Sequence, residues 1–328
     1  MSNINDQKRS MVITGLVITS LVMLAVMYFT PIWWVSLKAP NYPPEAFPDG
    51  IRIHFHFDGV FNGCSLVESK EVIIEEALNC VHEMDTINHY VGMYPIASGG
   101  PIERVLSQFL VSFLGVMLLG FIIVRKKPRL ITMGAGFLAI AIWMTTTMYN
   151  EGGVMQLSDG YRSAIQTALD LDDSDIVDWS GLESVTEGYR DTLGMYFRDA
   201  AVIDPKVETL KNWTNGIVIA LIVAMIILIV GNMLSKYFYW LLVLVPILLP
   251  VFFIADYAGW LWYFGHNLND MGAFAVKPFM PTVFGQGKVA QFSTHSYPHT
   301  GFFMMLIVSA MLIVAAVMRK KQMEDESL

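Results

Sequence analysis

Six long apolar runs constrain this chain more than any other feature, because each is long enough to cross a lipid bilayer as a helix. A spanning helix needs roughly 17–25 mainly apolar residues. Backbone groups in hydrocarbon must also form hydrogen bonds within their own segment, which favours helices. The runs cover residues 11–33, 105–124, 130–149, 216–234, 237–257 and 301–318. We therefore expect an all-α polytopic membrane protein with six transmembrane helices.

Composition agrees with a lipid environment. Hydrophobic residues make up 54% of the chain and charged residues 15%, whereas a soluble domain usually carries about 25% charged residues. The first run is too long for the apolar region of a typical signal peptide, and no small-residue cleavage site follows it. We interpret it as an uncleaved anchor, with Trp33 and Trp34 in the outer aromatic belt of the membrane.

Basic residues near the span ends predict the orientation, because Lys and Arg concentrate in short cytoplasmic segments. Ten of the 21 basic residues fall in four such segments, which alternate consistently along the chain. They are Lys8, Arg9, Arg125, Lys126, Lys127, Arg129, Lys236, Arg319, Lys320 and Lys321. This pattern predicts a multi-pass membrane protein with both termini in the cytoplasm and three long segments on the outer side.

The predicted organisation follows directly from these spans. It comprises the N-terminus and first span (1–33), an outer domain (34–104), spans two and three (105–149), an acidic outer segment (150–213), spans four and five (214–257), an aromatic and histidine-containing outer segment (258–300), and the last span with a cytoplasmic tail (301–328).

The three outer segments differ in character. In the first, residues 51–57 alternate with a period of two, which predicts a strand, and residues 67–84 have helical spacing, so we expect a small α/β domain. The second carries thirteen acidic and five basic residues, with helices expected at 160–171 and 183–201. It is either a solvated lobe or a docking surface for a basic partner. The aromatic third segment is expected to lie on the membrane surface.

Both cysteines and all seven histidines fall in the outer segments. Histidine is costly in hydrocarbon, so the topology itself explains part of this distribution. Cys64 and Cys80 in an oxidising compartment favour a disulfide. The alternative is a pair of thiolate ligands for a soft metal.

Soft-metal binding is the leading chemical interpretation, because imidazole and thioether groups suit copper. His54 and His56 would lie on one face of a strand, and His89 would meet Met93 on one side of a helix. The candidate ligands are His54, His56, His89, Met93, His266, His295 and His299. Each histidine also has a simpler interpretation as a hydrogen-bonding or surface residue.

Span five contains two prolines and a carboxylate. Pro246 and Pro250 are expected to kink or open the helix. Asp256 follows near the outer boundary, where it either has a functional role or reaches the interface. The chain has no nucleotide-binding loop and no nucleophile-elbow motif, and we expect no nucleic-acid partner.

Four segments carry a family resemblance. They are Pro31 to Pro43, Ile87-Asn-His-Tyr-Val-Gly-Met93, Tyr263-Phe-Gly-His-Asn-Leu268 and Ser296-Tyr-Pro298. They resemble motifs of a polytopic membrane protein family associated with nitrous oxide reductase (nos-type) gene clusters, including its Asn-His-Tyr-x-Gly-Met motif. The resemblance implies a role in maturation of, or electron supply to, a periplasmic copper enzyme. It also implies functional roles for Asn88, His89, Met93, His266 and Asn267. The His54–His56 pair, the cysteines and the acidic segment depart from the family's pattern.

Three functions follow as expectations. The first is an inner-membrane accessory protein that handles copper as a cofactor, with a periplasmic or membrane protein partner docking on its outer face. The alternative is a non-catalytic structural subunit of a larger complex, such as a copper-dependent membrane monooxygenase, in which Asn88, His89 and Asn267 bond backbone carbonyls. An enzyme in its own right is less favoured, because it needs a closed three-ligand metal site.

Overall fold

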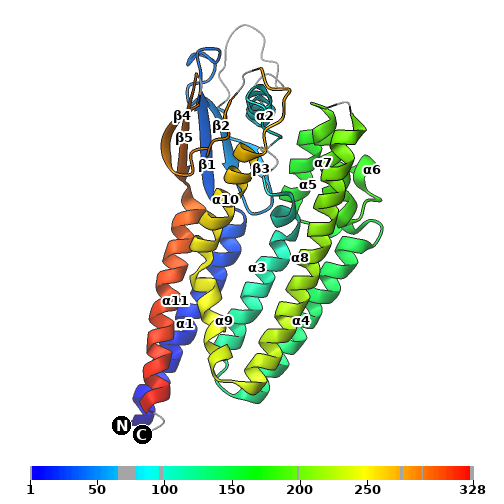
Figure 1. Cartoon of the computed structure of the whole chain (residues 1–328). Coiled ribbons are helices and arrows are strands. Elements are labelled where there is room, and N and C mark those ends of the chain that lie inside the picture. The colour runs from blue at the N-terminus through cyan, green and yellow to red at the C-terminus, as the bar shows by residue number, and fades with distance from the viewer. Residues whose placement is uncertain are drawn as a thin grey trace.

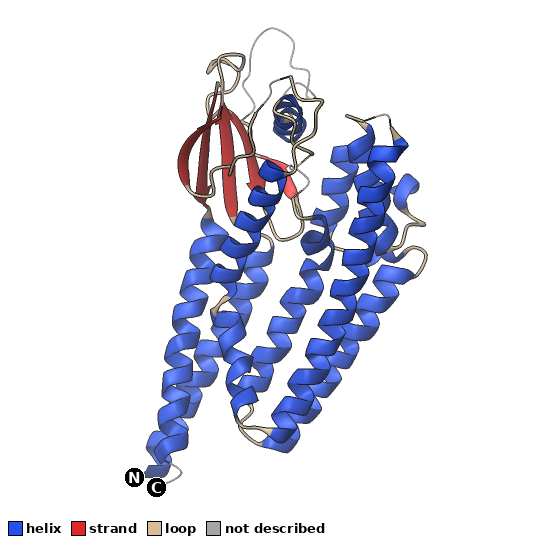
Figure 2. Cartoon of the chain, viewed as in Figure 1, coloured by secondary structure: helices blue, strands red, loops and turns tan. Residues whose placement is uncertain are grey.

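The computed structural model describes residues 2–65, 79–95, 99–197, 199–273, 276–289 and 291–325. Long helices form a bundle, and a small sheet with shorter helices caps the end that lies far from both termini (Figures 1 and 2). The chain is thus a mostly helical protein with a small antiparallel β part.

Five helices are each long and apolar enough to cross a membrane, and a bent pair brings the total to six in the described chain. They are α1 (Ser2–Tyr28), α3 (Pro101–Ile122), α4 (Lys126–Tyr149), α8 (Ala200–Leu234), α11 (Thr300–Asp325) and the pair α9 (Tyr237–Ile247) with α10 (Leu249–His266). The multi-pass prediction agrees with this arrangement. Side chains on the outward faces, such as Ile131, Leu138 and Ile219, are largely exposed, which a bilayer tolerates and water does not.

The fifth span is broken where the sequence predicts it. α9 and α10 meet at a bend of 59°. Pro246 and Pro250 flank the break, and each lacks the backbone N–H that a continuous helix would use. α9 packs closely on α3, whereas α10 leans away from it toward α11. The break therefore opens space between α3 and α10.

Both termini lie at the same end of the bundle (Figure 1). α1 and α11 run side by side, and Arg9 forms an ion pair of 2.7 Å with Asp325. The two short cation-rich links, between α3 and α4 and between α8 and α9, lie at this end as well. All four basic segments therefore share one side of the bundle.

Five antiparallel strands form one sheet at the opposite end. They are β1 (Trp33–Lys38), β2 (Ile51–Phe55), β3 (Val60–Asn62), β4 (Gly285–Val289) and β5 (Phe292–Pro298). Their order is β3-β2-β1-β5-β4. β1 pairs with β2 on one side and with β5 on the other, so Trp34 lies between His54 and Tyr297. The first and third outer segments therefore build a single domain.

Two details differ from the sequence-based expectations. The third outer segment supplies two strands instead of lying along the membrane surface, because β5 completes the hydrogen bonding of β1. The helix of the first span ends at Tyr28, and Trp33 lies on β1, where it is only 1% exposed and packs against Tyr257.

A helix and a disulfide complete the outer domain. α2 (Cys80–Tyr90) packs against β2 and β3, with Met84 and Ile87 facing Ile51 and Ile53 in a shared core. The helix predicted at 67–84 overlaps α2 only at its end, and the rest of it lies outside the described residues. Asn79 caps α2 by accepting a hydrogen bond from the backbone N–H of Val81.

The acidic segment forms a helical lobe at the end of the bundle away from the termini, where it packs against α3, α4 and α8 (Figure 1). It contains a short 3-10 helix η2 (Gly153–Gln156), α5 (Asp159–Leu169), α6 (Asp173–Ile176) and α7 (Gly181–Gly194). Ser180 and Glu183 cap α7 reciprocally. The predicted helices lie close to α5 and α7, although the second one ends at Gly194.

Candidate functional site

One face of the outer sheet carries the polar and aromatic side chains, and the other carries the core. Along β2, Ile51 and Ile53 are buried, whereas Arg52 and His54 occupy the opposite face. The Arg52 guanidinium stacks 4.1 Å from the centre of the Trp34 ring. The alternation predicted for residues 51–57 is therefore present in β2, and it places His54 on the outward face of the sheet.

Three histidines lie close together at the edge of this face. The ring centres of His54 and His299 are 5.2 Å apart, although these residues come from β2 and from the start of α11. His56 follows β2, packs edge-on against Phe61 at 4.7 Å, and interacts electrostatically with both other histidines. The sheet thus brings together imidazoles that are far apart in the sequence.

Burial keeps these imidazoles neutral at pH 7. Burial, followed by His299 and Arg52, lowers the pKa of His54 to about 4. Burial, followed by the two neighbouring histidines, lowers the pKa of His56 to about 4. Burial and Arg52 also lower the pKa of His299. Neutral imidazole is the form that binds metal ions.

Hydrogen bonding already occupies one nitrogen of His299. Its Nδ1 accepts a hydrogen bond of 2.8 Å from the backbone N–H of Thr300, at the first residue of α11. The neutral ring then carries its proton on Nε2. A metal ion at Nε2 would require that proton to move to Nδ1, which would break the hydrogen bond to Thr300.

Within the described residues, no three His, Cys, Asp or Glu side chains are arranged to hold a metal ion. His295, on β5, lies between Ser36 and Gln286 in the strand register. A closed three-ligand centre, which an oxidoreductase of this kind would need, is therefore missing from the described chain.

The ligand set that the family motif implies does not converge. The His89 ring packs against Tyr196 and Phe197, with ring centres 5.0 and 5.9 Å away. His266 is exposed, stacks on Trp262 at 4.6 Å, and has Nδ1 2.8 Å from the Trp262 carbonyl oxygen.

Met93 is only 4% exposed, in an apolar cluster with Val91 and Phe264. Its thioether therefore belongs to the core, and the motif separates His89, Met93 and His266 into three different environments.

The two motif asparagines have different surroundings. Asn88 is 7% exposed, lines a cavity of about 80 Å³, and its Nδ2 has no hydrogen-bond partner among the described residues. Asn267 donates from Nδ2 to the carbonyl of Tyr263 at 2.7 Å. His89 also has an unpartnered Nδ1 in this part of the structure. The expected backbone bonding by side chains is therefore present only at Asn267.

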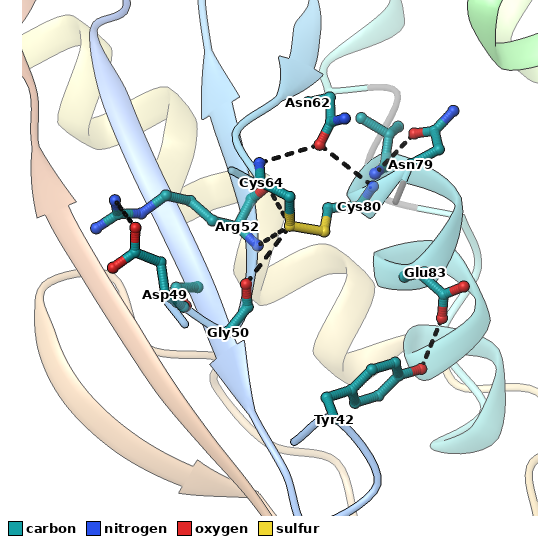
Figure 3. Close-up of a disulfide and its surroundings, with 11 residues drawn as sticks. Tyr42, Asp49, Gly50, Arg52, Asn62, Cys64, Asn79, Cys80 and Glu83 are labelled. Carbon is teal, nitrogen blue, oxygen red and sulfur yellow. Dashed lines mark hydrogen bonds and ion pairs between the residues drawn. A yellow bond between two sulfur atoms is a disulfide. The ribbon is translucent and has the colours of Figure 1, made fainter. Parts of the chain in front are cut away.

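Cys64 and Cys80 form a disulfide, as the redox argument predicts (Figure 3). Their Cα atoms are 6.0 Å apart. Asn62 Oδ1 accepts hydrogen bonds from the backbone N–H groups of both cysteines, and the Cys64 sulfur accepts one from the N–H of Arg52. The bond fastens α2 to the edge of the sheet, and it removes both thiols from the set of candidate metal ligands.

Asp256 lies in the wall of a larger cavity under the outer domain. The cavity measures about 340 Å³, and Glu103, Arg104 and His56 also line it. Glu103 interacts electrostatically with Asp256 and accepts a hydrogen bond of 3.1 Å from Trp260 Nε1. Sequence reasoning found Asp256 but missed Glu103 and Arg104, which precede the apolar run at the start of α3 and look like ordinary interface charges.

Comparison of the chain with protein-family models, with curated proteins and with solved structures gave no match.

Proposed function

We propose that this chain is an accessory protein of the bacterial inner membrane, with both termini in the cytoplasm, that binds copper on its periplasmic face in support of a periplasmic copper enzyme. The observation that carries the proposal is the pairing of His54 with His299, whose ring centres are 5.2 Å apart. His56 interacts electrostatically with both rings, but the three histidines do not form a metal-binding group among the described residues.

The chemistry of the three side chains suits this role. Imidazole binds copper well in both oxidation states, and the lowered pKa values of His54 and His56 leave these rings uncharged at neutral pH. Arg52 stands close by and opposes a second positive charge. A small imidazole set beside a guanidinium favours weak, exchangeable binding, with coordination positions left for a ligand from a partner.

The His299 hydrogen bond adds a second reason for exchange. Copper at Nε2 would displace the Thr300 N–H from Nδ1 and leave the first turn of α11 with one more unpaired donor. Loading the ion therefore costs part of the helix cap, and releasing the ion restores it.

The test is a competition titration of the purified full chain against a Cu(I) chelator. His54→Ala and His299→Ala should each lower the affinity at least about tenfold, the effect of losing one ligand from a small set. His266→Ala is the matched control, because His266 is exposed and stacks on Trp262. Undetectable copper binding, or equal affinity in all three variants, would refute the proposal. A loss of copper affinity in His89→Ala alone would instead favour a site at the motif residues His89, Met93 and His266.

A second candidate is a structural subunit of a larger membrane complex. Of the motif residues named for this role, Asn267 hydrogen-bonds to a backbone carbonyl, and Asn269, just after that motif, joins it to Gly92. The acidic lobe around α5 to α7 would then receive a basic partner. Isolation of a stable complex in gentle detergent, with no copper in this subunit, would support this alternative over the first.

A further inference from the structure

A large cavity lies where the outer domain meets the membrane bundle. Its volume of about 340 Å³ falls within the range of roughly 300–1,000 Å³ that is usual for small-molecule sites. Residues of α3, of the α9–α10 break and of the segment after β2 form its walls. The bend at Pro246 and Pro250 creates the space, because it directs α10 away from α3.

The cavity is polar at one end and apolar at the other. His56, Glu103, Arg104, Asp256 and Trp260 line the end beside the outer domain. Leu114 lies ten residues after Arg104 on α3, roughly 15 Å deeper along the helix axis, and Val245 and Leu249 line the same depth from the broken span. Such a gradient suits a molecule with a polar head and an apolar tail.

Arg104 is a buried cation that has no carboxylate partner among the described residues. Its side chain is buried, with 7% of the residue exposed, and the guanidinium lies 5.5 Å from the centre of the Tyr161 ring. None of the ion pairs found among the described residues involves it, and its Nε has no hydrogen-bond partner there. A buried charge without a carboxylate partner is unfavourable, so this position favours a ligand that brings a hydrogen-bond acceptor into the cavity.

Acceptors without partners lie at the same end of the cavity. Glu103 Oε1 accepts from Trp260, but its buried Oε2 has no partner in the described structure. Asp256 lies close enough to interact with Glu103 electrostatically. Arg104 Nε and Glu103 Oε2 are therefore the buried polar atoms at this end that a bound ligand could engage.

The charged side chains at the polar end of the cavity determine what charge the polar group of a ligand can carry. An anionic head would be repelled by Glu103 and Asp256, and a cationic head would be repelled by Arg104. An uncharged head that both accepts and donates hydrogen bonds satisfies both sets. Aromatic side chains, among them Phe113, Phe252, Phe253 and Phe264, surround the space and favour a flat ring.

We propose that this cavity binds a membrane-soluble quinol or its quinone. One ring oxygen would accept from the Arg104 guanidinium, and a hydroxyl of the quinol would donate to the Glu103 carboxylate. The apolar chain would pass between α3 and the α9–α10 break. This site is separate from the candidate copper ligands His54 and His299, although His56 lies between the two.

The experiment compares three ligands that share a ten-carbon chain and differ in the head: a decyl-substituted quinone, decanoate and decylamine. Binding to the purified full chain in detergent is measured by titration calorimetry, with the quinone expected to bind at a ratio of one. Arg104→Met should weaken quinone binding on the order of tenfold, as expected for the loss of a charge-assisted hydrogen bond. Arg129→Met is the control, since Arg129 is also buried and also lies over a tyrosine ring, but outside this cavity.

A second variant distinguishes loss of the binding site from misfolding of the protein. Val111→Trp should fill the apolar part of the cavity and abolish quinone binding, whereas Leu138→Trp, on an exposed face of α4, should not change it. Arg104→Met removes an unpaired buried charge, so it should not lower thermal stability. Equal or tighter binding of decanoate or decylamine, or quinone binding that survives Val111→Trp, would overturn the proposal.

Discussion

Asn269 donates two hydrogen bonds to the carbonyl oxygen of Gly92, one from its backbone N–H and one from Nδ2, each 2.7 Å long. The two residues lie 177 positions apart: Gly92 belongs to the motif at residues 87–93, and Asn269 directly follows the one at 263–268. The two motif segments therefore meet in space through hydrogen bonds to the Gly92 carbonyl.

Gly92 should tolerate no side chain at this junction. Its φ of +79° is a left-handed conformation, and an added Cβ would lie 2.7 Å from the backbone oxygen of Asn269. Gly92→Ala should therefore lower the free energy of unfolding by at least about 1–2 kcal/mol. Thermal unfolding in detergent measures the effect. Gly194→Ala is the control, because an added Cβ there meets nothing within 4 Å, and an equal change in both variants would contradict the argument.

Ser296 is the polar centre under the sheet. Its Oγ accepts from Trp33 Nε1 at 2.8 Å, donates to the Val283 carbonyl at 2.8 Å, and lies 3.2 Å from the Tyr257 hydroxyl. Ser296→Ala would leave a buried indole N–H without a partner, which costs about 1–3 kcal/mol. The melting temperature should fall clearly for this variant and very little for Ser293→Ala, on the same strand. An unchanged melting temperature in Ser296→Ala would contradict the argument, because it would mean that the Trp33 N–H donates to another acceptor.

The disulfide should stabilise the outer domain. Cys64 and Cys80 are separated by 16 positions, and closing a loop of this size stabilises a fold by roughly 3 kcal/mol on the chain-entropy model. We expect Cys64→Ser with Cys80→Ser to lower the unfolding temperature, and reduction of the unmodified protein to produce the same shift. The double variant should not respond to reductant. A response of the double variant would show that the reductant acts elsewhere.

The histidine cluster should make the outer domain sensitive to acid. The pKa values of His54 and His56 are lowered to about 4 from an ordinary value of 6.5. Between pH 6.5 and pH 4, His54 and His56 are therefore protonated in the unfolded chain and remain neutral in the folded chain. The stability contributed by these two neutral rings is fully present above pH 6.5 and is lost as the pH falls toward 4.

The measurement is the melting temperature as a function of pH. His54→Gln combined with His56→Gln should flatten the profile between pH 6.5 and pH 4, because glutamine does not titrate there. His266→Gln should leave the profile unchanged, since His266 lies at the exposed end of α10. An unchanged profile in the double variant would place the acid sensitivity in another group.

Local pattern was sufficient to predict the membrane part of the fold. Apolar length predicts the spans, Pro246 and Pro250 predict the break, and alternation predicts the strand at β2. These features depend on the solvent around each segment or on backbone chemistry within it. The same is true of the disulfide, because Cys64 and Cys80 are the only cysteines in the sequence.

Long-range pairing could not be predicted in this way. Nothing in residues 285–298 indicates that their partner is β1, about 260 residues earlier in the chain, because strand pairing depends on hydrogen bonds that every backbone can make. For the same reason the sequence does not reveal that His299 meets His54. Arg104 was missed because an arginine at the start of a span usually lies in the lipid headgroup region, and only the packing of α5 and α7 around it buries this one.

The position of β1 at the centre of the sheet has a consequence for biosynthesis. Its partner β5 lies about 260 residues later and directly precedes α11, so the edge of β1 that β5 covers stays open during translation until β5 has been made. Folding of the outer domain is thereby tied to insertion of the C-terminal helix. A nascent chain arrested before β5 would leave that edge exposed to proteases and chaperones, whereas a chain that includes β5 would cover it.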